Sequence, residues 1–300
     1  MENKKISIVI LTKNNSKTIG KVLSQIHKQQ INKDFEVIIV DSGSSDDTID
    51  IISAFNDKLY RIQPGNFGHG RTRNLASGYG SGDYIVYLSA DAIPANENWL
   101  NNLVEKLDDE SVAATFGRQI PFENTPPMER FFIQRNYPQI KNEPYLMKDF
   151  NMNSFFSNVN SAIKRSVWNK MNFNEGLIIS EDYEWAKRVF DSGYGIEYVP
   201  DAPVYHSHNY GLKQVFKRYF DSGVSFSQMD LKPGVIQKGM GYFLDEMRFV
   251  AHESLTMIPY AICYDFFKFL GFFFGLHNRW IPGYMKIHLS MHSYYWKNGL

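Results

Sequence analysis

Residues 35–48 read FEVIIVDSGSSDDT, an apolar run that ends in an Asp, a Gly and several hydroxyl side chains. The apolar part shows no alternation with polar residues, and neither does Ile6–Leu11, as expected for central parallel strands covered on both faces. Comparable β-rich runs lie at 59–63, 84–88 and 112–116, and helical patterns between the runs begin near Ser16, Ser45, Gly70 and Asn98. This order predicts an α/β fold with a mostly parallel central sheet.

The chain changes character after these runs. Residues 119–156 contain prolines and aromatic residues without a clear period, which predicts an inserted lid or acceptor-side segment. Strands are then expected near 158–163, 196–199 and 204–207, with helices beginning at Ser166, at Glu181 and near Leu212. After Asp230 the sequence is mostly helical in pattern, so we expect a helical, aromatic-rich C-terminal region.

The composition excludes several classes of protein. With 300 residues, of which 43% are hydrophobic and 21% charged, the chain is neither disordered nor of low complexity. Its 32 basic and 32 acidic side chains give a net charge of zero, so no nucleic-acid partner is expected. The single cysteine, Cys263, excludes an internal disulfide and fits a reducing compartment. Because Ile6–Leu11 is too short for a signal-peptide core, we expect a cytoplasmic protein.

One later segment, Ile258–Leu276, is long enough to span a bilayer, but Asp265 and Lys268 interrupt it near its centre. Its pattern is amphipathic, which leaves two alternatives, a core helix or an interfacial helix at the inner face of the plasma membrane. Residues 212–300 carry four more basic than acidic side chains and many phenylalanines. Such a region suits a peripheral membrane contact, and it equally suits a homodimer interface.

The loops after the predicted strands carry the candidate donor-binding residues, because ligands of open α/β sheets bind beyond the carboxyl ends of the strands. The Asp41 carboxylate can accept from a base or a ribose hydroxyl, and Gly43 allows a tight turn; alternatively, Asp41 only holds that turn. Residues 65–76, GNFGHGRTRNLA, place Arg71 and Arg73 at the start of a helix, where a diphosphate is attracted. These glycines follow the third run and do not form the dinucleotide fingerprint, which disfavours a nicotinamide-cofactor enzyme.

Acidic and histidine side chains follow the later runs. Asp91, in YLSADAIP (87–94), is placed to hold Mg²⁺ or Mn²⁺, which prefer oxygen ligands and share them with substrate phosphates. Glu181 and Asp182 lie at the start of a predicted helix. Either they only interact favourably with the helix dipole, or one of them is a general base. His206 and His208 are two residues apart and share one face of a strand, which indicates a metal or phosphate contact.

In this order, the motifs resemble the inverting nucleotide-sugar glycosyltransferases of family 2, which have a GT-A fold, and especially the bacterial rhamnosyltransferase-like branch. The resemblance covers about residues 5–225 and includes DSGSSDDT, FGHGRTRNLA, FFSNVNSAIKR, SEDYEWAKRV and VYHSHNY. It implies Asp182 as catalytic base with Glu181 beside it, and a divalent cation (Mg or Mn) held by Asp91 with His206 or His208. It also implies that the nucleotide sugar is bound by Thr12, Asn14, Asp41, Gly43, Arg73 or Arg71, Ser89 and Ala90.

One departure from the family pattern concerns the metal. The usual D-x-D is Ser89-Ala90-Asp91 here, so the first carboxylate is missing and weak metal affinity is expected. The implied organisation is a GT-A domain over residues 1–228, with a nucleotide-binding part to about 118 and an acceptor part from 119. Residues 229–300 would form a helical extension that contacts a membrane or a second copy of the chain.

The expected activity is transfer of a sugar, with rhamnose as the family-level expectation, from a nucleoside-diphosphate donor to a glycan or lipid-linked glycan acceptor of a bacterial surface polysaccharide. A sugar nucleotidyltransferase is an alternative, but it would need a glycine-rich basic loop after the first strand, which residues 12–15 lack. A non-catalytic glycan-binding or assembly protein is suggested by Ser89, whereas the retained Glu181, Asp182 and paired histidines argue against it.

Overall fold

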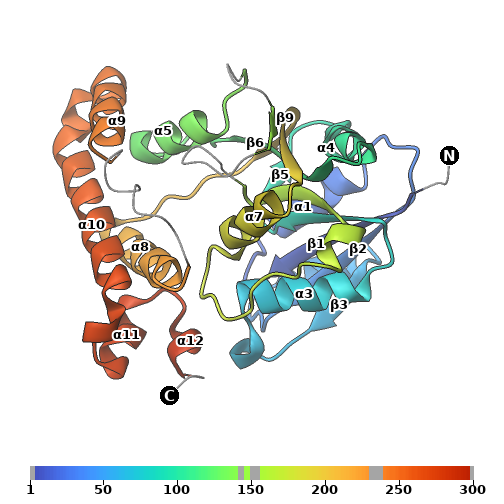
Figure 1. Ribbon diagram of the computed structural model, residues 1–300, viewed down its shortest axis with the longest axis horizontal. Helices are drawn as coiled ribbons and strands as arrows, with labels where there is room; N and C mark the ends of the chain where they lie inside the picture. Colours follow the sequence, from blue (N-terminus) through green and yellow to red (C-terminus); the bar gives the residue numbers. More distant parts are fainter. Residues whose placement is uncertain (1–3, 141–144, 149–155, 230–238, 298–300) are drawn as a thin grey trace.

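The structure is a computed structural model that describes residues 4–140, 145–148, 156–229 and 239–297. Figure 1 shows a twisted sheet with helices on both faces, and a group of helices from the C-terminal part of the chain beside it. The α/β class and the helical C-terminal region are therefore confirmed. The predicted boundary at residue 228 adjoins 230–238, which lie outside the described residues, and it stays a prediction.

Within the described residues the strands form one nine-stranded sheet, in which β3, β2, β1, β4, β8, β6, β9 and β5 follow one another and β7 pairs with β9. The first four of these run parallel, whereas β8 is antiparallel to both β4 and β6. The strands are β1 (Ile6–Thr12), β2 (Phe35–Asp41), β3 (Lys58–Arg61), β4 (Tyr84–Ser89), β5 (Ile93–Pro94), β6 (Val112–Ile120), β7 (Leu146–Met147), β8 (Asn160–Lys164) and β9 (Gly195–Tyr205).

Helices connect the strands and build the C-terminal region. They are α1 (Ile19–Ile26), α2 (Thr48–Ser53), α3 (His69–Tyr79), α4 (Trp99–Glu105), α5 (Pro127–Asn136), α6 (Arg165–Trp168), α7 (Glu181–Asp191), α8 (Leu212–Phe226), α9 (Gly239–Glu253), α10 (Ile258–Leu276), α11 (Gly283–Leu289) and α12 (Ser293–Lys297). Among the residues that the structure describes, four short 3₁₀ turns, at 64–66, 106–108, 255–257 and 278–280, join some of these elements.

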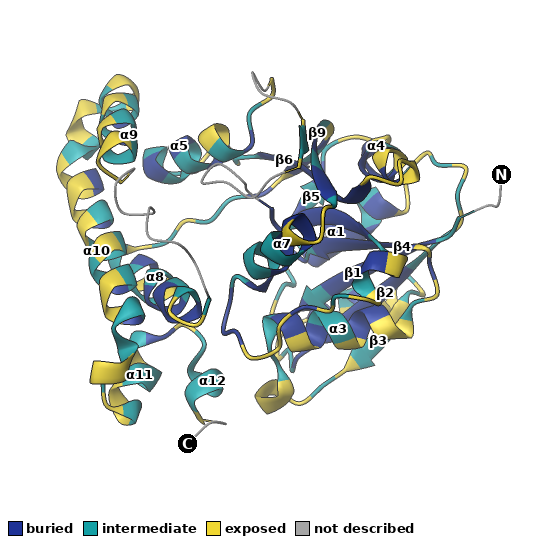
Figure 2. Cartoon of the chain, in the orientation of Figure 1, coloured by how far each residue is buried: buried dark blue, intermediate teal, exposed yellow. Residues whose placement is uncertain are grey.

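The core lies on both faces of the sheet, as the uninterrupted apolar runs require. On one face α1 and α4 bury side chains such as Leu23 and Trp99, and on the other α3 and α7 bury Ala76 and Trp185. Figure 2 shows the central strands β1, β2 and β4 largely buried and exposed residues on the outer surfaces of the helices. This packing fixes the strand ends, and with them the loops that carry the candidate site.

One expectation about elements is incomplete and another is wrong. The segment 119–156, expected as an inserted lid or acceptor-side segment without a clear period, contains the helix α5 at Pro127–Asn136, which buries Met128, Phe131 and Ile133. The spacing of these three residues gives no clear helical stripe, and residues 141–144 and 149–155 lie outside the described part. The two strands expected near 196–199 and 204–207 are one strand, β9, because its pairing with β6 continues across an irregularity between Gly117 and Gln119.

The helix α10 is buried on one side and exposed on the other. By length and composition, Leu255–Leu276 could cross a membrane, with a mean hydropathy of 1.3 and 17% of the window buried, and it is the one such span in the described residues. Its two charged residues are paired within the protein: Lys268 lies 3.0 Å from Asp265 and 3.4 Å from the buried Glu246 of α9. Asp265 and Lys268, which interrupt the hydrophobic pattern, therefore lie on the side of α10 that packs against the protein.

Candidate active site

The first two strand ends form a pair of interlocked loops. Thr12 ends β1 and Asp41 ends β2, and the two residues are paired in the sheet. Asn14 has a left-handed backbone; its N–H donates to Ser44 Oγ at 2.8 Å, and its Oδ1 accepts the N–H of Ser45 at 2.8 Å. Asn14 therefore fixes the second loop against the first.

The buried carboxylate of Asp41 is used inside its own turn. It accepts the N–H of Gly43 at 2.9 Å, the N–H of Ser44 at 3.1 Å and the Ser44 hydroxyl. This is the turn-holding alternative, and a contact of Asp41 with the nucleoside stays a prediction. At Gly43 the φ angle is +90°, and a Cβ would lie 2.7 Å from Pro64 Cγ, so glycine allows the second and third loops to meet.

The structure separates the two candidate arginines. Arg73, on α3, forms an ion pair with Glu181 at the start of α7, and their side chains are only 13% and 4% exposed. Arg71 has a side chain that is 55% exposed, lies 3.7 Å from Glu175 and lines a different cavity. Arg73 is thus the arginine that reaches the cleft between the strand ends.

A cavity of about 450 Å³, which we call the donor cavity, opens beyond the carboxyl ends of β1, β2 and β4. Of the predicted donor-binding residues, Thr12, Arg73 and Ser89 line it, together with Lys13 and Ser42. Apart from Arg71, the others lie in the loops behind it; the buried Ala90, for example, accepts the Thr18 hydroxyl at its carbonyl oxygen, at 3.0 Å. The volume of the donor cavity is in the range of small-molecule sites.

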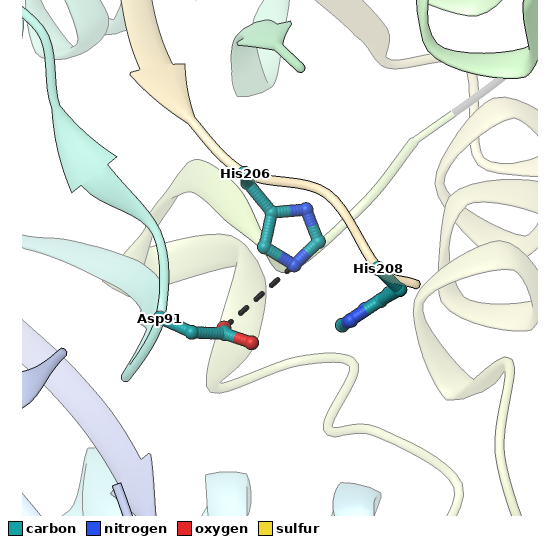
Figure 3. Close-up of side chains that lie close together, drawn as sticks. All are labelled: Asp91, His206 and His208. Atoms are coloured by element: carbon teal, nitrogen blue, oxygen red, sulfur yellow. Dashed lines mark ion pairs between the residues drawn. The ribbon is translucent and has the colours of Figure 1, made fainter. Parts of the chain in front are cut away.

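Asp91, His206 and His208 come together from two separate loops. Their ligand atoms all lie within 4.8 Å of one another, and Asp91 Oδ1 is 3.7 Å from His206 Nε2. Figure 3 shows the three side chains converging, with Asp91 from the loop after β4 and the histidines from the segment after β9. The sequence predicted all three residues as metal ligands, and the structure places them in one cluster.

The surroundings of His206 suit a metal ligand. Its Nδ1 lies 2.8 Å from Gln119 Oε1, so Nδ1–H is the donor and the unprotonated Nε2 faces Asp91. Burial and the neighbouring His206 lower the pKa of His208 to about 4, so both rings are neutral and able to bind a cation at pH 7. One carboxylate and two imidazoles form a donor set that fits Mn²⁺ better than Mg²⁺, which prefers oxygen ligands.

Asp182 lines the same cavity as this cluster, and its carboxylate forms no ion pair with a described residue. Its Oδ2 accepts the N–H of Asn158 at 3.1 Å, and its Oδ1 accepts its neighbour's N–H at 2.9 Å, which orients the group. Burial, followed by the charge of Glu181, raises the pKa of Asp182 to about 6, although Arg73 opposes this shift. The carboxylate of Glu181 is paired with Arg73, so Asp182 is the better placed of the two acidic candidates to accept a proton.

The cluster and Asp182 share a central cavity of about 280 Å³ that joins two others. His69, Arg73, Ser89, Met291 and His292 line both the central and the donor cavity. Asp182, His206, His208 and Arg218 line both the central cavity and a third one of about 320 Å³, which we call the acceptor cavity. The three form one continuous cleft.

Several cleft residues were not predicted from the sequence. His69 lies within the quoted glycine-rich stretch, but no spacing marked its side chain. Arg218 is on α8, and the segment Met291–Tyr294 reaches the donor cavity from the far end of the chain. No local pattern in the sequence could indicate these contacts, because they depend on the path of the C-terminal helices.

Comparison with known proteins identifies the family of the chain. The family described as Glycosyl transferase family 2 matches residues 7–171. The chain belongs to this family. The O-antigen chain rhamnosyltransferase WbaN of Salmonella anatum is 36% identical over 90% of the chain and 89% of its own length, and RfbN of Salmonella typhimurium is 34% identical over 98% and 96%.

A solved structure supports the fold. The mannosyltransferase PcManGT from Pyrobaculum calidifontis, in complex with GDP-Man and Mn²⁺, superposes with a TM-score of 0.62 at 17% identity, over 93% of the chain and 87% of that protein. The family resemblance and the GT-A fold are thus confirmed. The chain is a glycosyltransferase of an inverting family, so the alternatives of a nucleotidyltransferase and a non-catalytic protein are set aside.

Proposed function

We propose that the protein transfers rhamnose, with inversion, from a nucleoside-diphosphate donor to a growing surface glycan. The observation that carries this proposal is the continuous cleft, in which the donor cavity, the Asp91–His206–His208 cluster and Asp182 adjoin one another. The choice of rhamnose rests on WbaN and RfbN, two relatives described as O-antigen chain rhamnosyltransferases that match the chain over most of its length.

In this mechanism, the Asp182 carboxylate accepts the proton of an acceptor hydroxyl as that oxygen attacks the anomeric carbon. The bond from this carbon to the diphosphate breaks on the opposite face, and the nucleoside diphosphate leaves. The hydrogen bonds from the N–H groups of Asn158 and Tyr183 hold Asp182 in place for this step.

The leaving diphosphate carries the charge that the site must stabilise. Asp91, His206 and His208 would hold a divalent cation, and when bound it would neutralise charge on the diphosphate. Arg218 lines the central cavity, and its guanidinium, which forms no hydrogen bond or ion pair with a described residue, adds a positive charge there. Ser89 lies where the family has its first carboxylate, so we expect the cation to bind weakly without nucleotide.

The acceptor cavity supports a glycan acceptor. It lies between α5, α8 and α10, and its walls include Phe132, Tyr137, Tyr210 and Tyr264. Aromatic rings present apolar faces and, in tyrosine, a hydroxyl at the edge, a combination that suits the alternating faces of a sugar. Asp182 lies at the end of this cavity that meets the central one.

We further infer that the protein works at the inner face of the plasma membrane on a lipid-linked acceptor. Ile262, Phe266, Phe269 and Phe273 are exposed on α10, at spacings that place them on one face of the helix. Trp280 and Tyr284, which follow the end of α10, are also exposed, and the basic residues Arg279 and Lys286 lie in the same stretch of the chain. An apolar face flanked by aromatic and basic residues is typical of interfacial membrane contacts.

A donor screen tests the proposed activity. The purified protein is incubated with lipid-linked glycan extracted from bacterial membranes and with a panel of nucleoside-diphosphate sugars, and the products are identified by mass. We expect one added deoxyhexose from a rhamnose donor. We expect the Asp182→Asn variant to lose this product while it still binds the nucleoside diphosphate, because the substitution removes the base and leaves the donor cavity intact.

Two results would contradict the proposal. If another sugar were transferred and rhamnose were not, the rhamnose assignment would be wrong. If Asp182→Asn were as active as the unchanged protein, the assignment of the base would be wrong.

A further inference from the structure

The C-terminal segment Ser290–Tyr294 forms a wall of the donor cavity, opposite the strand ends. Met291, His292, Ser293 and Tyr294 line this cavity, facing residues such as Thr12 and Arg73. The sequence assigned residues 229–300 to a membrane or dimer contact, and nothing in that assignment placed them at the donor. The observation therefore assigns a second role to the end of the chain.

Contacts on both sides fix this segment. The buried Asp221 of α8 accepts the N–H of Met291 at 2.9 Å, and Lys217 Nζ donates to the carbonyl of the buried Ser290 at 3.3 Å. On the side of the sheet domain, the Tyr294 ring packs edge-on against Phe67, with ring centres 5.5 Å apart. The wall thus connects α8 to the loop before α3.

His292 lies where this wall meets the centre of the cleft. It lines both the donor and the central cavity, and its ring packs edge-on against that of His69 at 5.0 Å. Its Nδ1 is 3.3 Å from the Tyr294 hydroxyl, which leaves Nε2 for a ligand. The buried Nε2 of His69 has no hydrogen-bond partner within the described residues.

A nucleotide sugar bound as proposed would extend across the place where the donor cavity meets the central cavity. Its nucleoside would lie near Thr12 and its sugar near Asp182, so its diphosphate would cross between the two cavities. Arg73, the predicted phosphate ligand at this junction, is already paired with Glu181. Burial, with His69 and Arg218 nearby, lowers the pKa of His292 well below its usual value, so the ring is neutral and can donate one N–H in the absence of a ligand.

We propose that His292 donates a hydrogen bond to the diphosphate of the nucleotide sugar, and that Ser290–Tyr294 is the part of the donor site that holds it there. This inference rests on the proposed function. It adds a phosphate ligand from outside the strand-end loops, on a segment that α8 positions through Asp221.

Calorimetry with uridine and thymidine diphosphates and the corresponding monophosphates, in the presence of Mn²⁺, tests this ligand. For His292→Ala we expect the affinity for the diphosphate to fall about tenfold or more, because a hydrogen bond to a charged group is lost. The affinity for the monophosphate should fall much less. His292→Gln, which keeps a donor, should recover most of the loss.

His288→Ala is the matched control, since His288 is exposed on α11 and lies outside the three cavities of the cleft. It should bind like the unchanged protein. Equal diphosphate affinity of His292→Ala and His288→Ala would overturn this inference, and so would equal losses for monophosphate and diphosphate, which would indicate a purely structural role. If the unchanged protein bound neither diphosphate, the proposed function itself would fail.

Discussion

At Asp182, the environment sets the pH at which the base can act. Burial and the Glu181 charge raise its pKa to about 6, and a carboxylate accepts a proton only when it is ionised. We expect kcat/KM to rise with pH through about 6 and then to level off. Rates measured from acidic to neutral pH at fixed donor and Mn²⁺ concentrations test this.

The neighbouring Glu181 provides the control for that profile. In Glu181→Gln the charge that disfavours an ionised Asp182 is removed and Arg73 is left beside it, so the rising limb should move to lower pH. A limb that stays in place in this variant would show that another group limits the rate.

Asp91 and Ser89 form a pair that tests the metal site. Asp91→Asn removes the only carboxylate of the Asp91–His206–His208 cluster, so Mn²⁺ affinity, measured by calorimetry with nucleoside diphosphate present, should fall about tenfold or more. Ser89→Asp restores the acidic residue that the family pattern has at this position, and it should strengthen Mn²⁺ binding. Unchanged Mn²⁺ affinity in Asp91→Asn would exclude Asp91 as a ligand.

At the scale of elements, α8 and α10 approach so closely that their contact requires glycines. A Cβ at Gly271 would overlap the carbonyl oxygen of Phe216, and Gly223 and Gly275 are equally crowded by the facing backbone. This contact fixes α8, which places Arg218 at the cleft and holds Met291 through Asp221. Packing in the C-terminal region therefore affects the geometry of the active site.

We expect Gly271→Ala to destabilise the protein by about 1–3 kcal/mol, because an added methyl group forces two packed backbones apart. Gly78→Ala is the matched control, since Gly78 lies in α3 with open space around its Cα, and alanine favours a helix. Thermal or urea unfolding measures the difference. Equal stability of the two variants would contradict the close contact between α8 and α10.

The elements also show what the sequence could and could not predict. The strands β1, β2 and β4 were predicted because their apolar runs are buried on both faces. Asp91 was predicted from the loop after β4, Arg73 from the glycine-rich stretch that enters α3, and Asp182 from the start of α7, and the structure places all three at the central cavity. The continuity of β9 was missed because its two prolines, Pro200 and Pro203, resemble a break, whereas the strand passes them with an irregular register. Asp41 shows that the role of a single residue could not be predicted from the sequence, because the same motif suits a ligand contact or a turn.

At the scale of the whole molecule, the exposed face of α10 is the feature that has no partner within the described residues. The side chains of Phe266 and Phe269 are 57% and 63% exposed. If the face lies at a membrane, Phe266→Ser combined with Phe269→Ser should weaken binding to vesicles of anionic phospholipid by about tenfold or more, because burial of a phenylalanine side chain is worth about 1.5–3 kcal/mol. Vesicle sedimentation measures this.

Ile140→Ser is the matched control, since Ile140 is also exposed but lies in the segment after α5 and not on α10. It should bind vesicles like the unchanged protein. A dimer that dissociates in the double variant, with vesicle binding unchanged, would show that a second copy covers this face instead of a membrane.

The C-terminal region carries both the exposed face of α10 and His292, which lines the donor cavity. The sequence could not reveal this return of the chain. Residues near 12 and residues near 292 line the same cavity because of how α8, α10 and α11 pack, and no periodicity in the sequence indicates that packing.

The central claim is that loops from distant parts of the chain form one site that holds a diphosphate beside a base. The most direct test is a crystal structure with a nucleoside diphosphate and Mn²⁺, in which anomalous scattering locates the metal. We predict a metal bound by Asp91, His206 and His208, a diphosphate that joins it to the donor cavity, and the Asp182 carboxylate facing the open side of that site. A nucleotide bound elsewhere, or a metal away from these three side chains, would contradict the account.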